Sequence, residues 1–271
     1  MITYLNIGYN GRFGNQIFQF ASTIGIGEKL GYDVLFPNFN IINSIVQRNA
    51  NGVAFNARFD LLDCFDIDKQ YFSDTILVNK TKGERFFQFD KELFEITDMT
   101  NIDGYLQSEK YFEHCKEKII NTLKIKQELI DKANNLLPKT DKELVSIHIR
   151  RGDYLYLEGL HSLNGIDYVE KAIKELNGDF HYVICSDDIE WCKGIWGDKN
   201  SFTVIDSKSS YIDFATLSLC QHHIISNSSF SWWSSYLSNN KTKKIIAPKN
   251  WFGEKMQHSL TDLYTKEMIV I

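Results

Sequence analysis

Residues 144–154 read LVSIHIRRGDY, a strand-like run that ends in two arginines, a glycine and an aspartate. Short runs rich in Ile and Val that stop at Gly indicate β-strands. A helix-like stretch follows over 167–176, and a second strand-like run, HYVICS, occupies 181–186. A strand, a helix and a further strand in this order are typical of a crossover unit in a parallel sheet. We therefore expect an α/β fold.

The same alternation continues toward the C-terminus. We expect strands over 202–205 and 222–226, and helices that begin near Asp188, span 211–220 and begin again near Phe230. Parallel sheets bind ligands outside the carboxyl ends of their strands. Three polar segments, IRRGDY, CSDD and SNSSFSWW, follow strands of this predicted sheet.

Upstream of residue 144, the hydrophobic periodicity is weaker. Residues 2–7 predict a strand and 16–30 predict a helix, which Gly31 would end in the left-handed conformation. A short strand is expected over 33–36, and the aromatic region 38–103 shows no clear order of elements. Helices are expected within 108–137. The polar segment PKTDKE that begins at Pro138 predicts a boundary between domains 1–138 and 139–271.

Composition excludes several classes of protein. The chain has 271 residues, 43% of them hydrophobic, and a net charge of −5, which disfavours nucleic-acid binding. Its five cysteines form no CxxC pair, so we expect a reducing, cytoplasmic location. No apolar run is long enough for a membrane span or a signal core, and neither export nor membrane insertion is expected.

The arginines predict an anion site. In a strand over 144–150, His148 and Arg150 would project to one face and Arg151 to the other. Two guanidinium groups at a strand end suit a diphosphate, because each binds phosphate oxygens through a charged fork. Asp153 would orient one arginine or act as a base. The alternative is a purely structural turn in which Asp153 pairs with an arginine.

The other two polar segments allow two interpretations each. Ser186, Asp187 and Asp188 end a predicted strand, where carboxylates accept hydrogen bonds from a guanine base or from ribose hydroxyls, or cap the next helix. Asn227 and the serines that follow it stand where a strand meets a helix, so they suit phosphate oxygens or form a polar cap. These two serines are Ser228 and Ser229.

Two further motifs are less specific signals of function. Asp66 and Asp68 form a DxD pair, an arrangement that holds a divalent metal in many sugar transferases, but this spacing is common by chance, so no metal is expected. A basic cluster of Lys241, Lys243 and Lys244 would suit an anionic membrane surface, although a solvated surface is the ordinary interpretation.

Six segments in one order resemble the alpha-1,2-fucosyltransferases of glycosyltransferase family 11. Arg12 and Phe13 stand where that family usually has Gly-Leu, and residues 38–100 match no known pattern. The matching segments are GRFGNQIFQFA, GYLQSEKYFE (104–113), VSIHIRRGDY (145–154), YVICSDDIEWCK (182–193), ISNSSFSWWSSYL (225–237) and IIAPKNWF (245–252).

The resemblance implies a GT-B-like fold, with two facing Rossmann-like domains, parallel sheets and an active site in the cleft between them. Domain 1–138 would face the acceptor and domain 139–271 would hold the donor. The implied reaction is metal-independent transfer of L-fucose, with inversion, from GDP-fucose to the 2-hydroxyl of a terminal beta-galactoside. No cofactor is implied. A galactose-terminated, lipid-linked acceptor, surface polysaccharide synthesis and peripheral contact with the inner membrane are also expected.

The resemblance also implies roles for individual residues. The H-x-R-R motif would bind the donor, with Arg150 at the diphosphate and at the reacting centre. The residues expected at the donor are Asn15, Gln16, His148, Arg150, Arg151, Ser186, Asp187, Asp188, Asn227, Ser228 and Ser229. Asn15 and Gln16 are equally suited to contact fucose or the acceptor. A base is expected in the loop after the arginines, where the candidates are Asp153, Glu158 and His161.

Three other functions compete with this interpretation. A transferase for a different nucleotide sugar would use the same scaffold. A non-catalytic glycan-binding protein would account for the 14% of aromatic residues but not for paired arginines at a strand end. A dehydrogenase would need G-x-G-x-x-G, whereas Gly8, Gly11 and Gly14 are spaced by three and no acidic residue ends the next strand.

Overall fold

The computed structural model describes residues 1–38, 46–48, 54–56, 58–157, 159–256 and 258–271. The chain forms two compact units. Unit 1 comprises Met1–Lys124 with Ser259–Leu263, and unit 2 comprises Ile125–His258 with Tyr264–Ile271. The division after Lys124 lies before the predicted boundary at 138, because helix α5 (Gln127–Leu136) packs against helix α8 (Ser210–Ser218) of unit 2.

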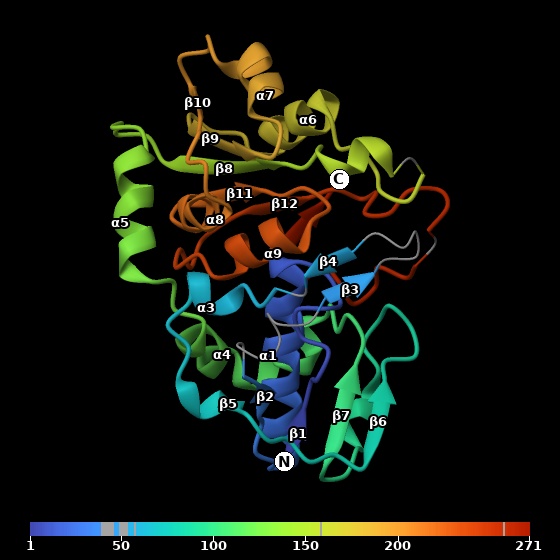
Figure 1. Ribbon diagram of the computed structural model, residues 1–271. Coiled ribbons are helices and arrows are strands. Elements are labelled where there is room, and N and C mark those ends of the chain that lie inside the picture. The colour runs from blue at the N-terminus through green and yellow to red at the C-terminus, as the bar shows by residue number, and fades with distance from the viewer. Residues whose placement is uncertain (39–45, 49–53, 57, 158, 257) are drawn as a thin grey trace. The chain divides into compact units, whose positions relative to one another are not determined.

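Unit 2 is built on a parallel sheet of six strands (Figure 1). The strand order is β10-β9-β8-β11-β12-β13, and every neighbouring pair is parallel. Strands of such a sheet are buried on both faces, which explains their Ile- and Val-rich sequences. The strands are β8 (Leu144–Ile149), β9 (His181–Ser186), β10 (Phe202–Val204), β11 (His222–Ile224), β12 (Ile245–Ala247) and β13 (Met268–Val270).

Helices cover both faces of this sheet (Figure 1). On one face, α6 (Ile166–Leu176) and α7 (Ile189–Trp196) pack against Val145, Ile147 and Ile149 of β8. On the other face, α8 packs against β9, and α9 (Ser229–Tyr236) packs against α8. The alternation predicted from the sequence is confirmed, whereas strands β12 and β13 were not predicted.

Strand β8 lies where the direction of winding reverses. From β8 the chain passes to β9 and β10 on one side, and it then returns to β11 on the other side of β8. In open parallel sheets, the crevice at such a reversal is the usual ligand site, because the two loops leave the sheet in opposite directions. The register places Ile149 beside Ser186, so β8 and β9 end at the same level.

Unit 1 contains shorter strands. Its main sheet is parallel, in the order β1-β7-β6, and two two-stranded sheets, β2-β5 and β3-β4, accompany it. Its strands are β1 (Ile2–Thr3), β2 (Phe36–Pro37), β3 (Val46–Arg48), β4 (Ala54–Asn56), β5 (Phe72–Ser73), β6 (Lys80–Gly83) and β7 (Thr100–Asp103). Its helices are α1 (Phe13–Leu30), α3 (Leu61–Cys64), α4 (Lys116–Thr122) and the 3₁₀ segments η1 (Lys69–Tyr71), η2 (Lys91–Phe94), η3 (Glu109–Tyr111) and η4 (Glu113–Cys115).

Helix α1 forms the centre of unit 1. It packs against η2, η3, η4 and the two short helices α3 and α4, and most of its side chains are buried, the polar ones among them through hydrogen bonds within unit 1. Gly31 ends it with φ 71°, as predicted from the sequence. The strand predicted over 2–7 ends at Thr3, because the next free backbone donor, Leu5 N, bonds the Asn101 side chain instead of a strand.

Among the residues that the structure describes, none of the helices is long and apolar enough to cross a bilayer.

Candidate functional site

The two arginines after β8 are held by three carboxylates. Arg150 Nη2 lies 2.5 Å from Asp153 Oδ1, and Arg150 Nη1 lies 2.7 Å from Asp187 Oδ2. Arg151 Nε lies 3.0 Å from Asp188 Oδ2. All five side chains are between 19% and 35% exposed, so they lie at the surface of the edge and not in the core. The contact of Asp153 is therefore with Arg150.

Asp187 and Asp188 connect the ends of β8 and β9. Asp187 Oδ1 accepts a hydrogen bond from the backbone N–H of Arg151, at 2.8 Å. Asp188 caps α7, because its Oδ1 accepts from Trp191 N, and its own N–H donates to Ser186 Oγ. The capping role that the sequence allowed for Asp188 is thus present, and both aspartates also fix an arginine.

His148 lies on the opposite face of β8 from Arg151. Its ring packs against Phe230 of α9, with ring centroids 5.1 Å apart, and its Nδ1 hydrogen-bonds Ser226 Oγ at 2.8 Å. Arg151 lies over the Trp191 ring of α7, at 3.9 Å. Burial lowers the pKa of His148 to about 3, and the neighbouring Arg150 charge acts in the same direction. The imidazole is therefore neutral near pH 7.

Asn227 joins three segments of unit 2. Its Nδ2 donates to the carbonyls of Ser162 and Trp251, at 2.9 and 2.8 Å, and its Oδ1 accepts from Asn164 Nδ2 at 2.9 Å. Its carbonyl accepts from the Tyr154 hydroxyl. With 1% of its surface exposed, the side chain has a structural role. The sequence predicted Asn227 to contact the nucleotide sugar; in the structure its buried amide bonds three neighbouring segments of the protein.

The two serines after Asn227 begin helix α9. Ser228 caps the helix, since its Oγ accepts from Phe230 N at 3.3 Å, and Ser229 is the first helical residue. The backbone N–H groups of a first turn have no partner within the helix, so this end suits an anion, as the sequence predicts.

Two of the three candidate bases, Asp153 and His161, lie in the described part of the loop after β8. The His161 ring stacks on Tyr154, with centroids 4.2 Å apart, and Arg150 lies over the same tyrosine ring at 5.4 Å. Burial lowers the pKa of His161, while the charge of Asp153 raises it and that of Arg150 lowers it. The three side chains therefore share one neighbourhood. Glu158 lies outside the described residues.

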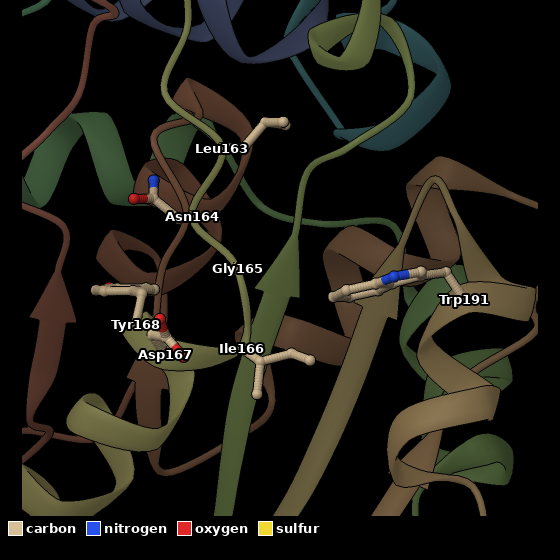
Figure 2. Close-up of a pocket in the computed structure, with 7 residues that line it drawn as sticks. All are labelled: Leu163, Asn164, Gly165, Ile166, Asp167, Tyr168 and Trp191. Carbon is tan, nitrogen blue, oxygen red and sulfur yellow. The ribbon is translucent and has the colours of Figure 1, made fainter.

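A cavity of about 450 Å³ opens between α6 and α7. Figure 2 shows the Trp191 indole pointing from α7 toward the segment that carries Gly165 and Ile166. The lining residues are Leu163, Asn164, Gly165, Ile166, Asp167, Tyr168 and Trp191. Trp191, the ring over which Arg151 lies, is one of the lining residues, and the volume of the cavity suits a small organic ligand.

The sequence did not single out Asp213, which lies in the first turn of α8. Its carboxyl accepts a 2.6 Å hydrogen bond from Ser207 Oγ, and its backbone carbonyl lies 3.8 Å from Cys185 Sγ of β9. Burial raises the pKa of Asp213 to about 6. A half-buried acid beside the ends of β9 and β10 is a further candidate for binding a base or a ribose. Its only sequence signal was its place after a short strand.

Unit 1 carries a second polar edge, made of amides. Gln107 Nε2 donates to Asn15 Oδ1 at 2.8 Å, and Asn10 Nδ2 donates to Asp103 Oδ1 at 2.9 Å. These residues follow β1 and β7 at the carboxyl ends of the parallel strands. Gly11, at φ 95°, allows this packing, because a Cβ there would lie 2.0 Å from Asn15 Nδ2.

Gln16, predicted as a ligand contact, is 1% exposed and uses its whole amide within unit 1. Its Nε2 donates to Arg58 O at 2.7 Å, and its Oε1 accepts from Asp60 N at 2.8 Å. These bonds hold the segment after residue 57. Gln107, which bonds Asn15 at this edge, was not singled out from the sequence, although it lies in the GYLQSEKYFE segment.

The weaker motifs have structural roles. Asp68 caps η1, where it accepts from Gln70 N. Lys243 donates to three carbonyls at the end of α9, those of Ser235, Tyr236 and Ser238, and Lys244 donates to Leu176 O at the end of α6. Cations at helix C-termini stabilise the helix. Two of the three clustered lysines therefore stabilise helices of unit 2.

Solved structures confirm the predicted fold class, α/β with parallel sheets of the GT-B-like kind. The structure superposes on POFUT1 in complex with GDP with a TM-score of 0.53, at 12% identity, over 91% of this chain and 97% of that chain. NodZ alpha-1,6-fucosyltransferase co-crystallised with GDP gives a TM-score of 0.50, at 12% identity, over 86% and 91% of the two chains.

Relatives by sequence are sugar transferases. The chain is 23% identical to the O-antigen biosynthesis glycosyltransferase WbnK of Escherichia coli, over 93% of this chain and 96% of that protein. It is 36% identical to an Escherichia coli alpha-1,2-colitosyltransferase, over 58% and 57% of the two chains. It is 23% identical to galactoside alpha-(1,2)-fucosyltransferase 1 of Gorilla gorilla gorilla, over 86% and 65%.

The family comparison spans nearly the whole chain. The model of the family described as "Glycosyl transferase family 11" matches residues 2–271, which include both polar edges. The resemblance drawn from the six sequence segments is confirmed, and the chain belongs to glycosyl transferase family 11.

Proposed function

We propose that the chain is an inverting alpha-1,2-fucosyltransferase that moves L-fucose from GDP-fucose to the 2-hydroxyl of a terminal beta-galactoside. The observation that carries this proposal is the pair Arg150 and Arg151, fixed by three carboxylates at the winding reversal of unit 2. Names of relatives support the sugar and the linkage, since one relative is a galactoside alpha-(1,2)-fucosyltransferase.

The proposed chemistry is a single displacement. The acceptor oxygen forms a bond to the sugar carbon while the bond from that carbon to the diphosphate oxygen breaks, and GDP leaves. Negative charge then grows on the diphosphate, which Arg150 stabilises best, because its guanidinium is charged at any working pH and already oriented. In this proposal the arginines serve the leaving group, so the reaction needs neither a metal nor a cofactor.

The hydroxyl proton goes to a base in the loop after β8. Asp153 is already engaged in an ion pair with Arg150, which holds its carboxylate at the guanidinium group. Burial lowers the pKa of His161, and its buried Nδ1 makes no hydrogen bond to any residue in the described ranges. We therefore favour His161 over Asp153, with Glu158 as the third candidate.

The remaining parts of the proposal concern the donor, the acceptor and the location. We assign GDP to unit 2, with the guanosine near Asp187, Asp188 and Asp213 and the phosphates near Ser228 and Ser229. We assign the galactoside to unit 1. Because a relative is named for O-antigen biosynthesis, a lipid-linked glycan at the cytoplasmic face of the inner membrane is the acceptor that we propose.

The test is incubation of the chain with GDP-fucose and a panel of beta-galactosides, with GDP release and product linkage as readouts. We expect alpha-1,2-linked product, and undiminished activity in EDTA. Loss of activity in EDTA with recovery in manganese would contradict the metal-independent mechanism. Binding of galactosides without any transfer or GDP release would leave a glycan-binding protein as the function.

A second donor is supported by one relative, the alpha-1,2-colitosyltransferase. Colitose differs from fucose by the absence of the 3-hydroxyl. A site that hydrogen-bonds this hydroxyl would discriminate strongly against the deoxy sugar, because its polar groups would be left without partners. Competition between GDP-linked fucose and GDP-linked colitose at equal concentrations decides between the two donors, and thermal stabilisation by GDP but not by UDP tests the nucleotide.

A further inference from the structure

A segment of unit 1 presents aromatic rings at the edge of its sheet. Residues 84–91 follow β6, whose carboxyl end lies beside that of β7 in the parallel sheet. Phe86 is 68% exposed and Tyr105, which follows β7, is 47% exposed. The rings of Phe87 and Tyr105 lie 6.4 Å apart. These rings therefore share the edge with Asn15 and Gln107, where parallel sheets bind ligands.

The same segment surrounds a cavity of about 240 Å³. Its lining combines rings with charged and amide groups: Arg85, Phe86, Gln88, Phe89, Asp90 and Lys91. Pockets for drug-sized ligands measure roughly 300–1,000 Å³, so this smaller cavity suits one unit of a ligand that continues beyond it.

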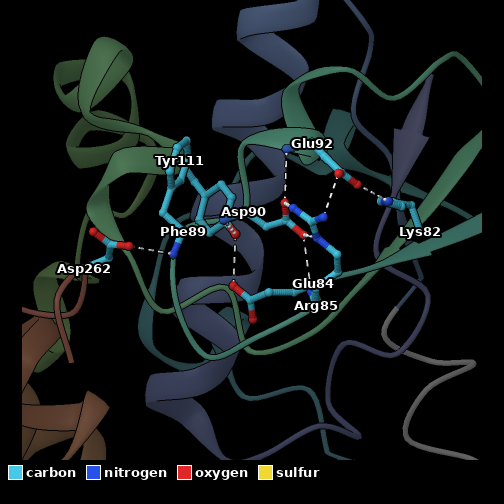
Figure 3. Close-up of polar contacts among 8 residues, drawn as sticks. All are labelled: Lys82, Glu84, Arg85, Phe89, Asp90, Glu92, Tyr111 and Asp262. Carbon is cyan, nitrogen blue, oxygen red and sulfur yellow. Dashed lines mark hydrogen bonds and ion pairs between the residues drawn. The ribbon is translucent and has the colours of Figure 1, made fainter. Parts of the chain in front are cut away.

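Polar contacts make this segment rigid (Figure 3). Asp90, whose side chain is only 3% exposed, accepts two hydrogen bonds from Arg85, at 2.9 and 2.8 Å. The Asp90 N–H donates to the Tyr111 hydroxyl at 2.8 Å, and that hydroxyl donates to Glu84 Oε1 at 3.0 Å. Glu84 Oε2 accepts from Leu106 N, which ties the segment to the chain after β7. Binding to a preorganised surface loses less conformational entropy.

Some hydrogen-bonding groups of this segment remain available to a ligand. Arg85 uses three of its five N–H groups on Asp90 and Glu92, and the other two bond no residue within the part of the chain that the structure describes. The Gln88 side chain is exposed beside them. A flat apolar ring next to a guanidinium and an amide is the combination that pyranose rings require, since their C–H face stacks on the ring and their hydroxyls take the hydrogen bonds.

We propose that residues 85–91 of unit 1 form a saccharide-binding subsite that holds a sugar of the acceptor glycan beyond the galactose that is modified. Phe86 stacks on the pyranose face, and Gln88 and Arg85 bond its hydroxyl groups. The proposal rests on the proposed function for the identity of the glycan, but the binding itself requires no donor and no transfer.

A contact between two copies of the chain is the competing explanation for an exposed phenylalanine. Stable protein interfaces bury about 1,200–2,000 Å² and have an apolar centre. Phe86 instead lines its cavity together with the charged residues Arg85, Asp90 and Lys91, and Tyr105, another exposed ring, is already in contact with Phe87. Charged surroundings of one ring favour a polar ligand.

The test measures binding without donor. The wild-type chain, Phe86→Ala and Gln88→Ala are each titrated with methyl beta-galactoside and with a tetrasaccharide that ends in beta-galactose, by calorimetry. Leu77→Ala is the matched control, because Leu77 is 67% exposed in the same unit but does not line the cavity. We expect Phe86→Ala to weaken tetrasaccharide binding about tenfold, to leave methyl galactoside binding unaltered, and Leu77→Ala to match wild type.

Each outcome separates this proposal from the proposed function. Equal tetrasaccharide binding by wild type and Phe86→Ala, or no saccharide binding by wild type, overturns the subsite even if fucose transfer is observed. A weakened Phe86→Ala in a chain that transfers no fucose supports the subsite and contradicts the transferase. Dissociation of a dimer by Phe86→Ala in sedimentation velocity, with saccharide binding unaltered, assigns Phe86 to a contact between copies.

Discussion

The carboxyl ends of the parallel strands in the two units carry different chemistry. In unit 2 the edge after β8 and β9 is ionic, with two guanidinium groups held between three carboxylates. In unit 1 the edge after β1 and β7 combines the amides of Asn10, Asn15 and Gln107 with the carboxylate of Asp103, which accepts a hydrogen bond from Asn10. An ionic edge suits a charged diphosphate, and an amide edge suits the uncharged hydroxyl groups of a sugar.

The ionic edge also shows how a cluster of cations is kept in place. Each arginine has a carboxylate partner, so the guanidinium groups are oriented before any ligand arrives, and the desolvation cost of a later ion pair is smaller. The amide edge is fixed differently, by close packing around Gly11 and by hydrogen bonds between amides. The preoriented cations that suit a diphosphate are therefore concentrated in unit 2.

The largest difference between the edges should appear in turnover. Arg150→Ala removes the cation expected at the leaving diphosphate, and we expect transfer to fall by about 10²–10³-fold, as when one stabilising donor is removed from a developing charge. The measurement is GDP release with GDP-fucose and a beta-galactoside, with circular dichroism to confirm folding. Asn15→Ala should instead raise the KM for the acceptor.

Lys193→Ala is the matched control for Arg150→Ala. Lys193 is also a paired cation of unit 2, with Glu190 and Asp206 as partners, but it is 42% exposed and lies on the surface of α7. We expect normal transfer from this variant. Near-normal turnover of Arg150→Ala, or an equal loss in Lys193→Ala, would remove the diphosphate role of the arginine pair.

One buried group in each unit, Glu84 in unit 1 and His148 in unit 2, should respond to pH with the opposite sign. Burial raises the pKa of Glu84 in unit 1 to about 7 from an ordinary 4.5, so the folded state holds its proton more tightly. This contribution to stability is complete below pH 4.5 and is lost as the pH rises through 7. The pKa of His148 is lowered to about 3 from 6.5, so its contribution is present above pH 6.5 and is lost on acidification.

Urea unfolding between pH 4 and 8 tests these two signs. From pH 5 to 8, wild type should lose roughly 2 kcal/mol of unfolding free energy relative to Glu84→Gln. Relative to His148→Gln, wild type should lose stability from pH 7 down to 4. Differences between variants are compared because Asp213, with its pKa raised to about 6, adds a contribution of the same sign as that of Glu84. Parallel curves of unfolding free energy against pH for wild type and variants would show that neither pKa changes on folding.

A smaller effect distinguishes the packing of the two edges. A Cβ at Gly11 would lie 2.0 Å from Asn15 Nδ2, and one at Gly152 would lie 2.4 Å from Asp187 Oδ2. Gly11 also has φ 95°, which side-chain-bearing residues rarely adopt. We expect Gly11→Ala to cost about 1–2 kcal/mol of unfolding free energy and Gly152→Ala less, with thermal denaturation as the measurement. The reverse order would mean that the carboxylates of unit 2 are the more rigid neighbours.

The sequence predicted unit 2 far better than unit 1, for a physical reason. Strands β8 and β9 are buried on both faces, and their apolar residues therefore reveal them. Strand β7 reads TNID, yet Thr100 and Asn101 are buried, because Asn101 bonds Leu5 N and Thr81 Oγ1. Burial that depends on hydrogen bonds with residues distant in sequence leaves no periodic pattern.

The site shows the same limit at the level of single residues. Motif spacing singled out the arginines and aspartates that the structure brings together after β8 and β9, but it left open whether they bind a ligand or serve as a turn and a helix cap. It did not separate Gln16, whose amide bonds the backbone of residues 58 and 60, from Gln107, whose amide bonds another amide at the edge. Residue type alone does not reveal which hydrogen bonds a folded chain leaves for a ligand.

The hub at Asn227 has a consequence for protein engineering. Because one amide binds the carbonyls of Ser162 and Trp251 and the side chain of Asn164, the loop after β8 and the segment after β12 depend on the same anchor. Exchanging only one of these loops between related transferases, in order to change the donor, would leave a mismatched partner. The two segments and Asn227 form a single cassette, and they should be transplanted together.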